Sequence, residues 1–352
     1  MNFGLKTQCV AAAFALSMAV MPAQAQAQQY TQTNLVSDTG AGGTKKDPNL
    51  VNAWGLSRSS GSPWWVANNG SNTSTLYASD GTAIPLIVTV PGGPTGTIFN
   101  GTTDFILGGK PAAFVFAAED GSISAWNGGA AATVVASKAA VYKGLALGSV
   151  NGANYLYATD FHNGKVDVLD TNFHYVTLEG HEYERPFHLE ECERGYAPFN
   201  IQNLGGTLFI TFAKQDAAKH DEVDGAGLGF VAAFTTEGRL LRVFQHGEWL
   251  NAPWGLALAP GDFGAFSHQL LVGNFGSGQI AAYNIETGKF QGVMLDAANK
   301  PISIDGLWGL GFGNGKTAGP LNTLYFSAGP NAEANGLFGT LTAVTAAFGN
   351  SN

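Results

Sequence analysis

The segment NAPWGLALAP, residues 251–260, contains the tripeptide Trp-Gly-Leu, which occurs again at residues 54–56 and 308–310. A small or special residue followed by a short, largely apolar run recurs through the chain. These repeats start at residues 55, 96, 144, 199, 255 and 309. Starts that lie 41 to 56 residues apart suit a β-propeller with one four-stranded blade per repeat. The sequence therefore predicts an all-β fold, a six-bladed β-propeller.

The interior of the repeats is consistent with four strands. Residues 208–212 (LFITF) are typical of a buried second strand, and residues 165–170 (KVDVLD) alternate as a half-buried third strand does. Asn69-Gly70 and Asp120-Gly121 are typical hairpin turns between such strands. Each repeat is thus expected to supply one antiparallel sheet.

The two ends of the repeat array predict how the ring closes. The last repeat runs out after its third strand, near residues 336–344, and a spare strand at residues 31–37 precedes the first repeat. We expect this N-terminal strand to be added to the last blade, where it protects an edge that would otherwise be open to aggregation.

The first residues have the pattern of a secretory signal peptide. Lys6 precedes an apolar run at residues 9–20, which is too short to span a bilayer, and Ala25 or Ala27 offers a cleavage site. We expect a signal peptide at residues 1–27, a propeller at 28–345 and a tail at 346–352. The protein is then exported to the periplasm or cell exterior, with no membrane span.

Composition excludes several classes of protein. The net charge is −9 with 12% charged residues and no basic cluster, which argues against nucleic acid or anionic lipid as a partner. Cys192 remains as a lone, inert cysteine once the signal peptide is removed, so no intramolecular disulfide is expected. The chain has no G-x-S-x-G, H-E-x-x-H or C-x-x-C motif. A monomer is expected, with a Glu-rich insertion at residues 179–194.

Several long segments carry a resemblance to a known family. They include DPNLVNAWGL (47–56), ATDFHNGKVDV (158–168), NAPWGLALAPGDFGAFSHQLLVGNFGSGQI (251–280) and IDGLWGLGFGNG (304–315). These segments resemble an uncharacterised family of exported bacterial β-propeller proteins, some of which carry PEP-CTERM sorting tails. The blade pattern is more distantly similar to NHL-repeat proteins and to gluconolactonase-like propellers, which implies metal-dependent lactonase chemistry as one expectation. The C-terminal AAFGNSN has no Pro-Glu-Pro motif, so a sorting tail is not expected.

One face of the predicted propeller gathers the residues that could take part in catalysis or ligand binding. Connections between blades and turns between second and third strands lie on the same face. Glu119 and Asp160 are candidate catalytic bases there, with His162 or Lys143 stabilising an oxyanion. Glu119, Asp160 and Asp305 are candidate ligands for a divalent cation, calcium, in the central channel.

Further polar residues in the same loops are candidate contacts for a small molecule or a surface polymer. These ligand-binding candidates are Asn52, Asn68, Asn69, Asp120, Lys214, Asp216, Asn251, Asn274 and Asp305. The alternative is structural, because Asn, Asp and Gly favour turns for their backbone geometry and local hydrogen bonds. Residues 214–229, rich in Asp, Glu and His, are expected to form a loop over the channel mouth, with metal binding as an alternative.

Three functions therefore remain open. The first is a ligand-binding or scaffold protein that uses the channel mouth, the second a metal-dependent hydrolase of the lactonase type, and the third a structural surface protein. The repeated Trp is expected to pack between neighbouring blades near the channel, and the Asn or Asp just before it to face the mouth.

Overall fold

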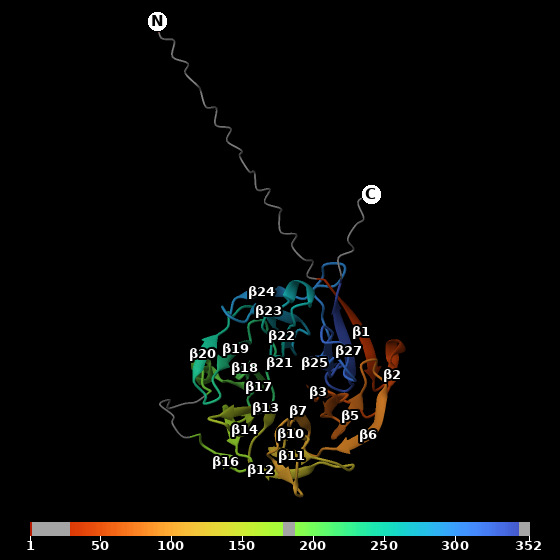
Figure 1. The fold of residues 1–352 in the computed structure, drawn as a ribbon, viewed down its shortest axis with the longest axis vertical. Helices are drawn as coiled ribbons and strands as arrows, with labels where there is room; N and C mark the ends of the chain where they lie inside the picture. The colour runs from red at the N-terminus through yellow and green to blue at the C-terminus, as the bar shows by residue number, and fades with distance from the viewer. Residues whose placement is uncertain (2–28, 179–186, 345–352) are drawn as a thin grey trace.

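The structure is a computed structural model that describes residue 1, residues 29–178 and residues 187–344. Within these residues, antiparallel sheets are arranged in a ring, and six of them form the blades of a propeller (Figure 1). The predicted fold class is confirmed. The expected signal peptide and C-terminal tail lie outside the described residues.

Each blade runs from an inner strand beside the central axis to an outer strand at the rim. The strands of blade 1 are β3 (Ala53–Ser57), β4 (Trp64–Asn68), β5 (Thr73–Tyr77) and β6 (Ala83–Thr89). Those of blade 2 are β7 (Pro94–Phe99), β10 (Phe114–Ala118), β11 (Ser122–Trp126) and β12 (Thr133–Ser137). Those of blade 3 are β13 (Tyr142–Val150), β14 (Ala153–Asp160), β15 (Lys165–Leu169) and β16 (Tyr175–Val176).

The second half of the ring repeats this order. The strands of blade 4 are β17 (Tyr196–Leu204), β18 (Thr207–Lys214), β19 (Gly229–Phe234) and β20 (Leu240–Val243). Those of blade 5 are β21 (Pro253–Leu258), β22 (Gln269–Asn274), β23 (Ile280–Asn284) and β24 (Phe290–Val293). Blade 6 contains β25 (Leu307–Phe312), β26 (Leu324–Ala328) and β27 (Leu337–Ala343) from the end of the chain.

The N-terminal strand completes blade 6. β1 (Tyr30–Ser37) pairs antiparallel with β27 over its whole length, and the two lie side by side at the ring closure in Figure 1. β2 (Lys45–Lys46) adds a short parallel edge outside β1. The expected closure by residues 31–37 is confirmed.

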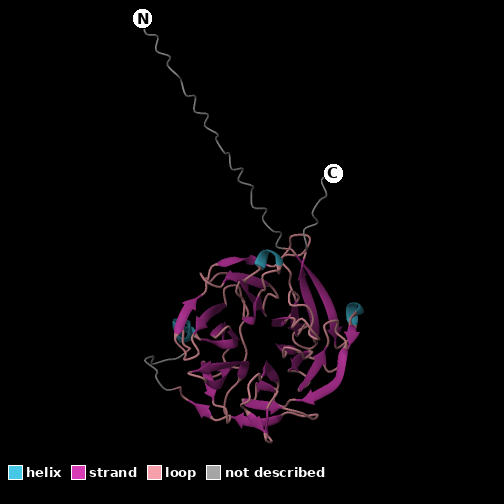
Figure 2. Cartoon of the chain, viewed as in Figure 1, coloured by secondary structure: helices cyan, strands magenta, loops and turns pink. Residues whose placement is uncertain are grey.

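Regular structure outside the blades is short and peripheral in the described chain. A hairpin of β8 (Ile106–Leu107) and β9 (Lys110–Pro111) leaves blade 2. The 3-10 helices η1 (Ala41–Gly43), η2 (Glu190–Arg194) and η3 (Gly264–Phe266) lie at the rim (Figure 2). η2 belongs to the Glu-rich insertion, whose residues 179–186 are outside the described part. No described helix has the length and apolar character needed to cross a membrane.

The inner strands share a bulge near their first residue. Strand pairing skips one position on the inner strand, for example between Pro253 and Gly255 or between Pro198 and Asn200. The bulged positions across the described blades are Trp54, Thr95, Lys143, Phe199, Trp254 and Trp308. In blade 4 the bulged residue is Phe199, which the sequence spacing places at the repeat start, so the position that glycine takes in the other blades falls one residue later, at Asn200.

Glycine follows the bulge because the inner strands touch there. A Cβ on Gly309 would lie 2.6 Å from the Trp54 carbonyl oxygen, and one on Gly255 would lie 2.6 Å from the Trp308 oxygen. Blade 4 has Asn200 at this position, and its Nδ2 donates to the Trp254 carbonyl 2.7 Å away. The Trp-Gly-Leu tripeptide thus marks the narrow waist where neighbouring blades meet.

Candidate functional site

Four of the six bulged residues in the described blades carry aromatic rings that pack together between the blades. Trp54, Phe199, Trp254 and Trp308 form one buried cluster, with Phe275 packed against it. Trp54 and Trp308 stack with ring centroids 3.4 Å apart, and Trp254 meets Trp54 edge-on at 5.7 Å. We call these five rings the aromatic plug. The expected packing role of the repeated Trp is confirmed.

Lys143 is the bulged residue that brings a charge to the plug. Its side chain is 0% exposed, and its Nζ lies 2.5 Å from Glu119 Oε1 and 3.1 Å from Asp221 Oδ1. The ammonium is also 5.1 Å from the ring centre of Trp54. Burial lowers the pKa of Lys143, but the nearby carboxylates outweigh it and the net pKa is raised. Lys143 is therefore held as a cation.

A chain of hydrogen bonds continues from Glu119 around the mouth. Asn69 Nδ2 donates to Glu119 Oε2 at 2.7 Å, and Asn52 Nδ2 donates to Asn69 Oδ1 at 3.3 Å. Asn52 Nδ2 also lies 2.5 Å from Glu333 Oε2, and the Trp308 indole donates to Asn52 Oδ1 at 3.1 Å. The network thus connects the loops of several blades to the plug beneath them.

Two more carboxyl groups face this network, and the pKa of each is raised. Burial, together with the charges of Glu333 and Asp221, raises the pKa of Glu222 to about 8 against the attraction of Lys143. Burial likewise raises the pKa of Glu333. We call Asn52, Asn69, Glu119, Lys143, Asp221, Glu222 and Glu333 the mouth cluster. It combines four carboxyl groups with one ammonium. Glu222 holds its proton at neutral pH, so the other three carboxyl groups face the single ammonium and favour a positive ligand.

One part of the mouth could hold a metal ion. A ligand atom from each of Glu119, His220 and Asp221 lies within 4.8 Å of the others. Two carboxylates and an imidazole suit a divalent cation, although Lys143 Nζ already contacts both carboxylates. A metal would therefore have to compete with the ammonium for Glu119 and Asp221.

The structure does not bring the predicted metal ligands Asp160 and Asp305 to Glu119. Asp160 is fully buried, and its oxygens accept hydrogen bonds from the Asn163 side chain at 2.6 Å and the Asn163 backbone at 3.2 Å. Asp305 Oδ2 accepts from the Asn331 backbone at 2.8 Å. Among the described residues, both carboxylates accept hydrogen bonds from backbone N–H groups in turns. His162 is exposed beside the Lys219 carbonyl, with Nδ1 at 3.3 Å.

The remaining candidates also hold loop structure. Asn68 donates to two threonine hydroxyls, at 3.1 and 3.0 Å, and Asn274 Nδ2 donates to the Gln279 carbonyl at 3.1 Å. Asn251 accepts from the Gly225 backbone at 2.7 Å. The other candidates contact their own neighbourhoods: Asp120 with Ser122, Lys214 with Arg194 and Tyr196, and Asp216 with His220.

Sequence reasoning thus found part of the mouth cluster: Asn52, Asn69, Glu119 and Lys143. The loop at residues 214–229 does reach the mouth, since Asp221 contacts Lys143. Asp221 and Glu222 were visible only as members of an acidic loop, with no spacing to single them out. Glu333 gave no signal, because its position depends on a backbone turn with φ of 65° that the sequence GPNAEANG does not specify.

Comparisons with known proteins agree with this architecture. No protein-family model matches the chain. An uncharacterised protein of Acanthamoeba polyphaga mimivirus is 29% identical over 326 residues, which is 87% of this chain and 78% of the viral protein. This relative is viral, so it lends no support to the expected bacterial family with sorting tails.

Solved structures share the propeller fold. A protein of unknown function from Bacteroides thetaiotaomicron superposes with a TM-score of 0.55 at 10% identity, covering 90% of this chain and 76% of that protein. A streptogramin B lyase superposes with a TM-score of 0.51 at 13% identity, covering 90% of this chain and 97% of the lyase. At these identities the likeness concerns the fold alone: the chain has the architecture of six-bladed β-propeller proteins.

Proposed function

We propose that this propeller is a ligand-binding protein whose mouth cluster takes up a small, positively charged ligand. The observation that supports this function is the fully buried Lys143 ammonium held between Glu119 and Asp221 above an aromatic ring. Burying an ammonium is costly unless carboxylates compensate it. The cluster supplies more carboxyl groups than Lys143 alone requires, which leaves acceptors for a second cation.

The geometry also explains why a cation rather than an anion is expected. Asp221 contacts Lys143 through Oδ1, so its Oδ2 can accept a further donor, whereas Glu119 Oε2 already accepts from Asn69. Carboxylates over an aromatic surface are the groups that bind organic ammonium ions, and carboxylate oxygens also bind Ca²⁺. The ligand class is therefore a cation that carries hydrogen-bond donors or accepts oxygen ligands.

A thermal-shift titration tests this function. The full chain is titrated with Ca²⁺, Mn²⁺, Zn²⁺ and putrescine, after chelation, alongside Glu119→Gln. A ligand at a hundredfold excess over its dissociation constant stabilises the native state by about 2.7 kcal/mol. We expect at least one cation to raise Tm for the unsubstituted protein and to do so far less for Glu119→Gln. No shift with any of them, or equal shifts in both proteins, overturns the proposal.

Metal-dependent hydrolysis is a second candidate, favoured by the meeting of Glu119, His220 and Asp221. A divalent cation held there would polarise an ester or lactone carbonyl, with Lys143 placed to stabilise the oxyanion. Lactone hydrolysis that depends on added metal and is lost in His220→Ala would support it.

Export remains part of the proposal. The pattern at residues 1–27 and the resemblance to exported propellers both support secretion and a site that meets ligands outside the cytoplasm. Expression of the full chain with N-terminal sequencing of the secreted product tests it, and cleavage after Ala25 or Ala27 is the expected result.

A further inference from the structure

A second cavity lies on the other side of the aromatic plug. It has a volume of about 500 Å³ and is lined by the inner strands of the blades, from their middle to their last residues. Trp254 of the plug is among its lining residues, while Leu258, at the end of β21, is exposed at its rim. We call this space the lower cavity. Its volume is within the range of about 300–1,000 Å³ that is usual for small-molecule sites.

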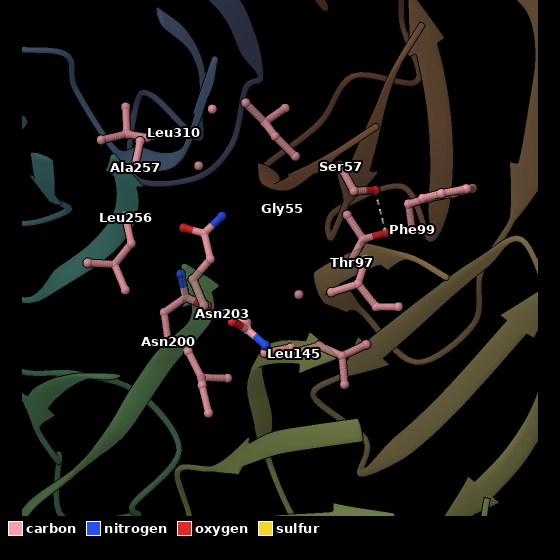
Figure 3. A pocket seen from close by; sticks show the side chains of 18 of the residues that line it. Gly55, Ser57, Thr97, Phe99, Leu145, Asn200, Asn203, Leu256, Ala257 and Leu310 are labelled. Atoms are coloured by element: carbon pink, nitrogen blue, oxygen red, sulfur yellow. Dashed lines mark hydrogen bonds between the residues drawn. The ribbon is translucent and has the colours of Figure 1, made fainter. Parts of the chain in front are cut away.

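The walls of the lower cavity combine aliphatic side chains with polar groups. Figure 3 shows Ser57 and Thr97 on one side and Leu256 and Leu310 on the opposite side. The Ser57 and Thr97 hydroxyl oxygens are 3.1 Å apart and hydrogen-bonded to each other. Gln202 also lines the cavity, and its amide has no hydrogen-bond partner within the described chain. The cavity therefore combines an apolar body with unused donors.

Arg58 is the single charged residue among the described residues that line the cavity. Its Nε donates to the Phe312 carbonyl at 2.5 Å, and its guanidinium lies 5.5 Å from the ring centre of Trp64. Neither terminal nitrogen has a hydrogen bond or a carboxylate partner among residues 29–178 and 187–344. Burial lowers the pKa of Arg58, yet the guanidinium stays charged at neutral pH. A half-buried cation is thus left without a counter-ion.

We propose that the lower cavity binds a small amphipathic carboxylate, with the carboxylate on Arg58 and the apolar part against the leucines of the inner strands. The terminal nitrogens of a guanidinium match the two oxygens of a carboxylate. One positive charge balances one negative charge, so a monoanion fits better than a phosphate dianion. This site is independent of the mouth cluster, from which the plug separates it.

Isothermal titration with hexanoate, hexanamide and hexylamine tests the charge requirement. Tryptophan fluorescence provides a second measure of binding, since Trp64 and Trp254 line the cavity. We expect saturable hexanoate binding, hexanamide binding weaker by about tenfold or more, and no hexylamine binding, because a hydrogen bond to a charged group is worth about 1.5–3 kcal/mol. Absence of saturable hexanoate binding at millimolar concentration, or equal binding of hexanoate and hexanamide, overturns the proposal.

Substitutions test where in the lower cavity the ligand binds. Arg58→Gln should weaken hexanoate binding by about tenfold or more. Arg242→Gln is the matched control, since Arg242 also donates to one backbone carbonyl, that of Ile285, but lies on the outer strand β20. At the exposed rim, Leu258→Glu should weaken binding more than Leu258→Gln does. Unchanged hexanoate affinity in Arg58→Gln overturns the proposal. Glu119→Gln should leave this affinity unchanged, which separates failure here from failure at the mouth.

Discussion

The two ends of the central channel have opposite electrostatic character although the same inner strands build both. The mouth cluster has four carboxyl groups and one ammonium tied into a hydrogen-bond network. The lower cavity has walls of mixed aliphatic and polar side chains, and Arg58 there has no carboxylate partner in the described chain. The aromatic plug, with Trp54 and Trp308 stacked at 3.4 Å, separates them. The start and the end of each inner strand therefore contribute to two sites of different chemistry.

Among substitutions compared at neutral pH, the largest expected effect comes from removing the buried cation at the mouth. Lys143→Met leaves Glu119 without the ammonium that compensates it, beside the Glu222 and Glu333 carboxyl groups. Loss of one partner of a buried ion pair costs about 3–5 kcal/mol, and the lower end applies because Asp221 is exposed. We expect the free energy of unfolding, measured by urea titration, to fall by about 3 kcal/mol.

Two controls sharpen this prediction. Lys300→Met removes an exposed lysine and should change stability by no more than about 0.5 kcal/mol. Adding Glu119→Gln to Lys143→Met should recover part of the loss, since the two residues are coupled. Equal losses for Lys143→Met and Lys300→Met would show that the ammonium is not buried as described.

The waist between the two ends gives the next effect. Gly309→Ala places a Cβ against the Trp54 carbonyl oxygen and the Ser327 hydroxyl, each 2.6 Å away, where backbone and a buried side chain cannot yield easily. Overpacking of this kind costs about 1–3 kcal/mol. Gly61→Ala is the control, because its added Cβ would meet only the end of Lys316 at 3.8 Å. A loss of stability limited to Gly309→Ala is the expected result of thermal unfolding.

The waist also shows how far the sequence could predict the fold. The six repeat starts, three of them within Trp-Gly-Leu, located the blades and their number, because a small residue favours the close contact of neighbouring inner strands. They misplaced blade 4 by one residue, since Asn200 replaces glycine there and hydrogen-bonds to the next blade instead. Local sequence does not show that a hydrogen bond from Asn200 replaces the close backbone contact that glycine permits in the other blades.

The candidate site was less predictable for a physical reason. Loop carboxylates look alike in sequence, yet Asp160 caps a turn while Glu119 pairs with a lysine from the next blade. Which role each takes depends on backbone turns and on contacts between distant segments. Arg58 illustrates the same limit, because only the ring of blades shows that no carboxylate of the described chain reaches it.

The pH dependence of stability tests the mouth cluster further. Glu222 has an ordinary pKa of 4.5 and a folded-state pKa raised to about 8. Below pH 4.5 both states hold the proton; between 4.5 and 8 the unfolded chain releases it while the folded chain keeps it. Stability therefore falls as pH rises through this window, by at most about 1.4 kcal/mol per pH unit from this group.

Glu222→Gln cannot ionise and should lose less stability across the same window. The Tm of the variant minus the Tm of the unsubstituted protein should increase as pH rises from 4.5 to 8, and this difference should stay constant above pH 8. Glu286→Gln, at an exposed position, should follow the unsubstituted protein at every pH. Parallel curves for all three proteins would contradict the burial of the Glu222 carboxyl.

The smallest effect is expected at the other end of the channel. Arg58→Gln removes a guanidinium that has one backbone hydrogen bond and one ring contact, but it also removes the cost of holding a half-buried charge without a carboxylate partner in the described chain. Because the two effects oppose each other, the net loss to folding is expected to be about 1 kcal/mol or less. Urea titration should thus show a loss well below that of Lys143→Met. If Arg58 were instead required for folding, its loss would match that of Lys143, and the lower cavity would be a structural element. A small loss of stability together with a large loss of hexanoate affinity is the combination that distinguishes a binding residue from a structural one.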